Sequence, residues 1–338
     1  MPHKVQLLPS NHKFIVENGE SVLTAALRQG VNLPYGCRSG NCGTCKGHLQ
    51  QGEIHYDVEH TSLTEEEKQH GIVLLCQAKA NSDLVIEAQV IPDSEEVVIK
   101  KLPCRVMEKI MLCHDVVSLR LKIPTIEKFA YLAGQYIDIL LPDGRHRSFS
   151  IANAPHTGDS LELHIRVVEG GEFTNHLLND IEVKTILRIE GPHGQFYLHE
   201  ESDRDIIFMA GGTGFAPIKS IIEYAITHNI ERQMYLYWGV RSREDLYMNN
   251  LARMWASDFK HIHYIPVLSD AVNNENQDVR TGYVHEAIAN DFPQKLANFD
   301  IYASGPPAMV EAGRIVFELN GLPAEQYYSD AFEFQGNK

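Results

Sequence analysis

Three cysteines and several glycines share one short stretch, residues 36–47, with the sequence Gly-Cys-Arg-Ser-Gly-Asn-Cys-Gly-Thr-Cys-Lys-Gly. The cysteines follow the spacing Cx4Cx2C, and a fourth comes after thirty intervening residues. This spacing is typical of a [2Fe-2S] site, whereas structural zinc sites usually pair two short knuckles. The neighbouring glycines let the backbone approach inorganic sulfide more closely than a Cβ would allow. A zinc knuckle and a disulfide loop remain alternatives. The predicted ligands are Cys37, Cys42, Cys45 and Cys76.

A second group of residues suits a flavin. Residues 147–150, Arg-Ser-Phe-Ser, combine a cation with a fork of donors, a flat aromatic face and a small hydroxyl donor. A surface arginine beside a core phenylalanine would also explain this motif alone. However, a predicted strand at 161–168 carries a second arginine, ends at a double glycine and enters a helix, and a helix N-terminus with a capping hydroxyl is an anion site. Together they predict a cradle for the FAD pyrophosphate. Its residues are Arg147, Phe149, Ser150, Arg166, Gly171 and Thr174.

A third group suits a nicotinamide nucleotide. An apolar strand at 206–210 runs into a glycine turn that opens a helix, an arrangement in which backbone N–H groups meet phosphate. The spacing matches neither GxGxxG nor a P-loop. Two more segments, residues 239–243 and 305–307, directly follow later strands of this predicted sheet. Ligands of such sheets bind beyond the carboxyl ends of the strands. Arg241 and Arg243 either hold an adenosine ribose or its 2′-phosphate, or begin a solvated helix. The predicted nucleotide residues are Gly211, Gly212, Thr213, Gly214, Pro217, Arg241, Gly305 and Pro306.

The elements around these groups predict three domains. In residues 1–92, strands at 4–8, 14–17, 46–54 and 84–90 accompany a helix that Ser21 caps, and Thr64 with Glu67 forms a capping box for a short helix. The expected result is a small sheet curled over a helix, with the cysteine loop on its rim. Residues 92–96 form a polar break.

Residues 102–200 and 203–338 form the other two predicted domains. The first has strand-like runs at 105–112, 116–123, 136–141 and 161–168, which predict an antiparallel β-barrel. In the second, strands at 206–210, 234–239, 261–268 and 300–304 alternate with a helix that runs to about 226 and with helical patterns over 244–255, 284–289 and 308–319. This alternation predicts an α/β doubly wound parallel sheet. Phe332, close to the end, is either its last core residue or an aromatic lid over a cofactor.

Composition limits the function further. The 338-residue chain carries a formal net charge of −15, which argues against nonspecific binding to nucleic acid or to an anionic membrane. A signal-peptide pattern and a run of eighteen apolar residues are both missing, so we expect a cytoplasmic protein. Six cysteines in a chain of this length do not make a disulfide framework. Cys104 and Cys113 are predicted to be ordinary buried thiols, and the seventeen histidines show no HxxxH or HExxH ligand motif.

The order of these three parts resembles the ferredoxin-fused branch of the ferredoxin-NADP reductase superfamily over nearly the full length. This branch includes methane monooxygenase and phenol hydroxylase reductases. Residues 131–138 and 147–155 are similar to the flavin-domain stretches of CDP-6-deoxy-Δ3,4-glucoseen reductases. The resemblance implies a β-grasp [2Fe-2S] domain, an FAD barrel and an NAD(P) domain.

The resemblance also implies roles for single residues. Arg147 would contact the FAD pyrophosphate, Phe149 would stack on the isoalloxazine, and Ser150 would lie near N5. Arg166 and Thr174 would complete the phosphate site. Phe332 resembles the aromatic residue that shields the flavin until nicotinamide displaces it. The chain has Phe149 where the family commonly has tyrosine, and Ser304 where many relatives have cysteine.

The expected function is therefore electron transfer from NAD(P)H through FAD and the cluster to a protein partner. The resemblance favours a dehydrase of deoxysugar biosynthesis as the partner, NADH as the nucleotide, and a monomer. An oxygenase component is the alternative partner. A redox-sensing or zinc-binding module that merely retained the cysteines is the alternative from outside enzymology.

Overall fold

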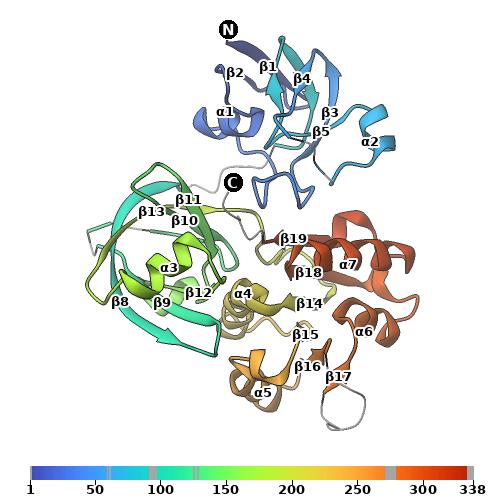
Figure 1. Cartoon of the computed structure of the whole chain (residues 1–338). Helices are drawn as coiled ribbons and strands as arrows, with labels where there is room; N and C mark the ends of the chain where they lie inside the picture. The colour runs from blue at the N-terminus through green and yellow to red at the C-terminus, as the bar shows by residue number, and fades with distance from the viewer. Residues whose placement is uncertain are drawn as a thin grey trace. The chain divides into compact units, whose positions relative to one another are not determined.

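The computed structural model describes residues 2–58, 60, 62–90, 97–124, 126–127, 129–270 and 279–332, so the predicted polar break at 92–96 lies outside the described residues. The chain divides into two compact units, residues 1–95 and 96–338. The ribbon diagram in Figure 1 labels their helices and strands. None of the helices within the described ranges has the length and apolar character needed to cross a membrane.

The first unit is a mixed sheet with strand order β2-β1-β7-β3-β5, against which one helix packs. Ser21 caps this helix as predicted, because its side chain accepts a bond from the Thr24 backbone N–H. The capping box between Thr64 and Glu67 is also formed. The elements are β1 (His3–Leu8), β2 (Lys13–Val16), α1 (Val22–Arg28), β3 (Lys46–Gln51), β4 (Ile54–His55), α2 (Glu65–Gln69), β5 (Ile72–Leu74), β6 (Lys79–Ala80) and β7 (Leu84–Glu87).

The second unit begins with a six-stranded antiparallel sheet of order β11-β10-β13-β8-β9-β12. A bridge between Ile151 and Leu163 joins its two end strands, so the sheet closes into the predicted barrel. Its core is mainly aliphatic, and Tyr131 and Phe173 add two aromatic rings to it. The elements are β8 (Lys100–Met111), β9 (Val116–Lys122), β10 (Tyr136–Leu140), β11 (His146–Ser150), β12 (Ser160–Arg166), α3 (Glu172–Asn179) and β13 (Ile186–His193).

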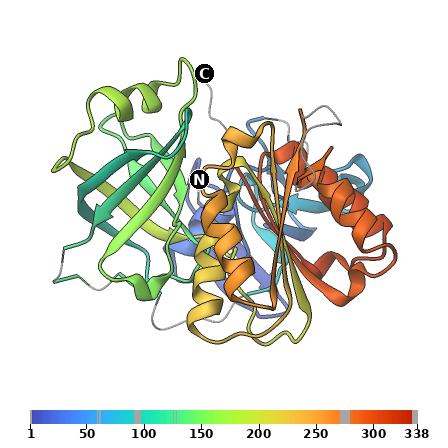
Figure 2. The same ribbon diagram turned by 90° about the horizontal axis from the view of Figure 1, so that it is seen from below.

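The same unit continues with a six-stranded parallel sheet of order β17-β16-β15-β14-β18-β19. Figure 2 shows this sheet nearly edge-on, with α4 and α5 on one face and α6 and α7 on the other, so the doubly wound prediction is confirmed. The elements are β14 (Asp205–Gly211), α4 (Phe215–Thr227), β15 (Met234–Val240), α5 (Asn249–Asp258), β16 (Ile262–Leu268), β17 (Arg280–Thr281), α6 (Val284–Asp291), β18 (Phe299–Gly305), α7 (Pro307–Leu319) and β19 (Tyr327–Ala331).

Three local predictions were wrong. The helix expected over 244–255 begins only at Asn249, because a capping box between Ser242 and Asp245 closes a separate 3-10 turn first. The strand expected over 46–54 is interrupted after Gln51, where Gly52 has a φ of +101°. Cys104 is buried as expected, but Cys113 is only half-buried, because it lies in the turn between β8 and β9 rather than within a strand.

Candidate functional site

The cysteine loop has the backbone that its glycines predict. Gly40 and Gly43 have φ values of +84° and +74°, a region that side chains with a Cβ rarely adopt. The Cys37 backbone N–H points at Cys42 Sγ at 3.4 Å, and the Asn41 N–H points at Cys37 Sγ at 3.3 Å. Gln77 and Ser62 hold the loop from outside by donating to the backbone carbonyls of Arg38 and Gly40. The loop therefore directs backbone donors at its own sulfur atoms.

Hydrogen bonds between neighbouring cysteines shift the pKa values of three of these thiols. A hydrogen bond from Cys42 lowers the pKa of the Cys37 thiol to about 5. The same bond, followed by desolvation, raises the pKa of Cys42, and a bond with Cys76 together with desolvation raises the pKa of Cys45. Neighbouring thiolates repel one another unless a cation lies between them. All four sulfurs are free of disulfide bonds, so the donor set fits an iron-sulfur cluster.

The flavin motif lies on β11, the end strand of the barrel sheet that meets the other end strand, β12, where the barrel closes. Arg147 is half-buried and donates to the His146 carbonyl at 2.9 Å. Phe149 contacts Phe173 of α3 with ring centroids 5.3 Å apart. The motif and the start of α3 therefore lie together, as a flavin cradle requires. Gly171 is the N-cap of α3, and a Cβ there would lie 2.7 Å from Thr174 Oγ1.

Thr174 and Arg166 both have protein partners. The Thr174 hydroxyl donates to the Val168 carbonyl at 2.9 Å, so it closes the turn before α3 and leaves the helix's backbone N–H groups to meet an anion. Arg166 pairs with Asp115 at 2.9 Å. Its guanidinium also lies 3.1 Å from the point where a Cβ on Gly212 would stand. Arg166 is therefore placed between the barrel and the nucleotide turn.

The glycine turn after β14 packs against the end of β18. A Cβ on Gly214 would stand 2.0 Å from the Ser304 carbonyl oxygen, and a Cβ on Gly305 would stand 2.9 Å from Gly211 Cα. Gly212 has a φ of +53°, and its carbonyl accepts a bond from Trp238 Nε1 at 3.0 Å. The close approach of these backbones explains the glycines. Thr213, Pro217, Arg241 and Pro306 lie at the same carboxyl edge of the sheet.

Ser150 and Asp330 join the flavin motif to the parallel sheet. The buried Ser150 hydroxyl donates to Asp330 Oδ2 at 3.2 Å, and Asp330 lies directly beside Ser304 in the register of β18 and β19. Ser304 is fully buried, and its hydroxyl has no hydrogen-bond partner among the described residues. Phe332 follows at the end of β19, half-buried, and its N–H donates to the Gly305 carbonyl. The side chains of Ser150, Ser304 and Asp330 therefore lie between the flavin motif and the carboxyl edge of the parallel sheet.

Asp330 and the residues that follow the flavin motif had no predicted role. Residues 152 and 153 offer carbonyls to α4: Lys219 Nζ donates to Ala152 at 3.1 Å, and Ser220 Oγ donates to Asn153 at 2.7 Å. Lys219 also pairs with Glu162 at 3.3 Å. The motif therefore does two tasks, since its second half fixes the parallel sheet against the barrel. An acidic residue two positions before a terminal aromatic was the only sequence signal for Asp330.

The buried charged groups at the junction of barrel and parallel sheet shift one another's pKa values. Burial alone would raise the pKa of Glu162, but the hydrogen bond from His164 and the charge of Lys219 lower it to about 2. Burial lowers the pKa of His164, whose ring bonds Glu162 at 2.9 Å and Tyr247 at 3.1 Å. Glu162 is therefore ionised at neutral pH, and it is compensated by Lys219.

We expect Ser150→Ala to slow flavin reduction by NAD(P)H by about fivefold, because it removes a hydrogen bond worth about 1 kcal/mol at the junction of barrel and sheet. Stopped-flow flavin absorbance measures the rate. Ser148→Ala is the matched control. Ser148 lies on the same strand as Ser150 and also donates to an aspartate, Asp138, at 2.6 Å, but this pair lies wholly within the barrel. Equal losses in both variants would contradict a specific role for Ser150.

Three family models match consecutive parts of the chain. They describe a 2Fe-2S iron-sulfur cluster binding domain over residues 5–81, an oxidoreductase FAD-binding domain over residues 103–197 and an oxidoreductase NAD-binding domain over residues 208–314. Each group of site residues falls within or beside the matching model. Phe332 lies beyond the last one.

Whole-length relatives carry the same three parts. The chain is 39% identical to CDP-6-deoxy-L-threo-D-glycero-4-hexulose-3-dehydrase reductase of Yersinia pestis, over 98% of this chain and 99% of the relative. It is 33% identical to terephthalate 1,2-dioxygenase reductase component 1 of Comamonas, over 98% of both chains. Among solved structures, the Amycolatopsis cytochrome P450 reductase GcoB matches with a TM-score of 0.80 and 30% identity, over 98% of both chains.

Proposed function

Because the chain belongs to the ferredoxin-fused branch of the ferredoxin-NADP reductase superfamily, we propose that its electron acceptor is a dehydrase of deoxysugar biosynthesis. The chain is an NAD(P)H-dependent oxidoreductase with FAD and a [2Fe-2S] cluster, and it passes electrons to a protein acceptor. The observation that carries the dehydrase is the 39% identity over 98% of the chain to a protein named as a dehydrase reductase. The reductase matches leave the redox-sensor alternative without support.

We assign the cofactors to residues as follows. FAD, when bound, accepts two electrons as a hydride and can release them one at a time, and the cluster carries one electron at a time. The three thiols of the cysteine loop and the thiol of Cys76 would hold the cluster. Arg147 would bind the FAD pyrophosphate with the N-terminus of α3, and Phe149 would lie against the isoalloxazine. Phe332 would cover the face of the flavin until nicotinamide displaces it. The pair of Ser150 and Asp330 would orient the reacting edge and exclude water from it.

We propose NADH as the preferred nucleotide. Arg241 and Asp270 lie side by side where β15 and β16 end, because the Asp270 N–H donates to the Arg241 carbonyl at 3.1 Å. Asp270 is exposed, and its carboxylate accepts a bond from Ser269 Oγ at 2.7 Å. A carboxylate at this edge can bond a ribose 2′-hydroxyl and repels a 2′-phosphate. This repulsion opposes the attraction that Arg241 and Arg243 would offer to NADPH.

The acceptor is tested by turnover. The full chain, loaded with FAD and cluster, is mixed with a CDP-6-deoxy-hexulose 3-dehydrase and its substrate, and separately with a dioxygenase oxygenase component. We expect nucleotide-driven product formation with the dehydrase to be at least about tenfold faster, and faster with NADH than with NADPH. Turnover of the oxygenase alone would favour the alternative partner, for which the Comamonas relative is the specific support. Dye reduction without turnover of either would reject both partners while leaving the reductase activity intact.

A further inference from the structure

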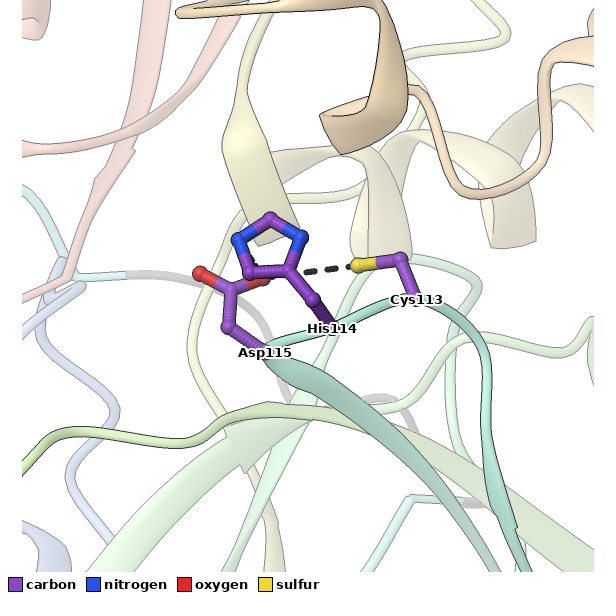
Figure 3. Close-up of side chains that lie close together, drawn as sticks. All are labelled: Cys113, His114 and Asp115. Carbon is purple, nitrogen blue, oxygen red and sulfur yellow. Dashed lines mark hydrogen bonds and ion pairs between the residues drawn. The ribbon is translucent and has the colours of Figure 1, made fainter.

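Three consecutive residues with metal-binding side chains form the turn between β8 and β9. Figure 3 shows the Cys113 sulfur, the His114 ring and the Asp115 carboxylate converging on one place. One ligand atom from each lies within 4.8 Å of the others. Consecutive side chains of a strand would point to opposite faces. Here the Leu112 N–H donates to the Val116 carbonyl at 2.8 Å and folds the chain back, so all three side chains meet.

The separations fit a tetrahedral metal ion. Cys113 Sγ lies 3.4 Å from Asp115 Oδ1, and His114 Nε2 lies 3.8 Å from the same oxygen. Zinc bonds sulfur at about 2.3 Å and nitrogen or oxygen at about 2.0–2.2 Å, so tetrahedral ligands stand on the order of 3.4–3.6 Å apart. The two separations from Asp115 Oδ1 therefore lie within a few tenths of an ångström of these values, and Cys113 and His114 lie within 4.8 Å of each other.

The parallel sheet places a buried carboxylate beside the His114 ring. Asp245, in the 3-10 turn after β15, is buried with 7% exposure. Its Oδ2 accepts bonds from the Ser242 N–H at 2.8 Å and the Ser242 hydroxyl at 3.2 Å. These bonds fix the carboxylate so that Oδ1 lies 3.7 Å from His114 Nε2. A buried carboxylate oxygen is thus directed from the sheet towards the turn of the barrel.

The chemistry of the donors selects the ion. A thiol and an imidazole exclude Mg²⁺ and Ca²⁺, which prefer oxygen ligands. A mixed set of sulfur, nitrogen and carboxylate oxygen is the set that Zn²⁺ binds. Arg166 holds the other oxygen of Asp115 at 2.9 Å, so Asp115 Oδ1 remains oriented towards the other donors.

We propose that Cys113, His114 and Asp115 form a Zn²⁺ site in the turn between β8 and β9 that leaves the fourth position of the ion open, with Asp245 of the parallel sheet orienting His114. The site is separate from the predicted cluster ligands, which belong to the other compact unit. The proposal does not depend on which protein accepts the electrons.

Equilibrium dialysis of the FAD- and cluster-loaded full chain against Zn²⁺, followed by elemental analysis, tests the site. We expect one zinc per chain with the iron content unchanged, and an X-ray absorption spectrum with a zinc–sulfur distance of about 2.3 Å. Cys113→Ser and His114→Gln should each weaken binding by at least about tenfold. Asp245→Asn should weaken it as well and should reduce the rise in melting temperature on zinc addition.

His176→Gln is the matched control, because His176 is about as exposed as His114 and pairs with Asp180 at 2.8 Å without a cysteine beside it. It should keep the zinc. His114 is exposed, so its variant reports on binding even where Cys113→Ser fails to fold, and FAD and iron contents establish folding of each variant. Absence of stoichiometric zinc in the unmodified chain, or zinc binding in the Cys113 and His114 variants as tight as in the unmodified chain, would overturn the site. Unchanged affinity in Asp245→Asn would overturn the role of Asp245 in orienting His114.

Discussion

A Cys42→Ser variant is expected to lose reduction of the protein acceptor by more than about 100-fold, while NAD(P)H still bleaches its flavin at the normal rate. Serine is a poorer ligand for iron than thiolate, so the cluster is lost or altered. The variant also removes the sulfur to which the Cys37 N–H points at 3.4 Å. Iron content, stopped-flow flavin absorbance and acceptor turnover measure the three consequences separately.

Cys104→Ser is the control for this variant. Cys104 is a buried thiol of the barrel that bonds the Leu187 carbonyl at 3.6 Å. Its replacement should leave iron content and acceptor turnover unchanged once folding is established. If folded, FAD-loaded Cys42→Ser also failed to reduce its flavin with NAD(P)H, the order nucleotide, flavin, cluster would be wrong.

The second large effect is expected from Gly214→Ala. The new Cβ would stand 2.0 Å from the Ser304 carbonyl oxygen and 2.8 Å from the Gly305 nitrogen. Both are backbone atoms, so a change of rotamer cannot relieve the contact, and the end of β18 must move away from the nucleotide turn. We expect flavin reduction by NAD(P)H to slow by about 100-fold and unfolding free energy to fall by about 1–3 kcal/mol.

Dithionite reduction separates this effect from damage to the flavin site, because it bypasses the nucleotide and should remain normal. Gly239→Ala gives a graded comparison at the neighbouring strand. Its Cβ would stand 2.9 Å from Val284 Cβ, a smaller overlap than the 2.0 Å approach at Gly214, so the loss should be smaller. A Gly214→Ala enzyme with normal kinetics and melting temperature would show that this close packing is not required.

Local signals in the sequence predicted the architecture well. The cap at Ser21, the capping box at Thr64 and the glycine turn after residue 210 were all formed, because each depends on side chains within a few residues. Cysteine spacing and the arginine-bearing strands likewise predicted which segments carry chemistry. The three-part order then made the family recognisable.

Features that depend on distant partners were missed. β13 ends in Gly191-Pro192, which is typical of a turn, and its place between β10 and β8 follows only from pairing across the barrel. The role of Asp330 arises because β19 aligns it with Ser304 and brings it to Ser150, 180 positions away. Cys113 was misplaced because a bend, rather than a buried strand, follows Met111. Such contacts are set by tertiary pairing, which one sequence does not display.

The buried pair of Lys219 and Glu162 limits how the chain can be cut into working pieces. Their side chains are 6% and 10% exposed, and they come from the parallel sheet's α4 and from the barrel. Separating these two parts would break this pair and expose both side chains, although Lys219 would keep Glu223 of its own helix and Glu162 would keep His164 of its own strand, each at 2.9 Å. We therefore expect a chain cut between the barrel and the parallel sheet to lose stability, and a cut between the two compact units to spare this pair.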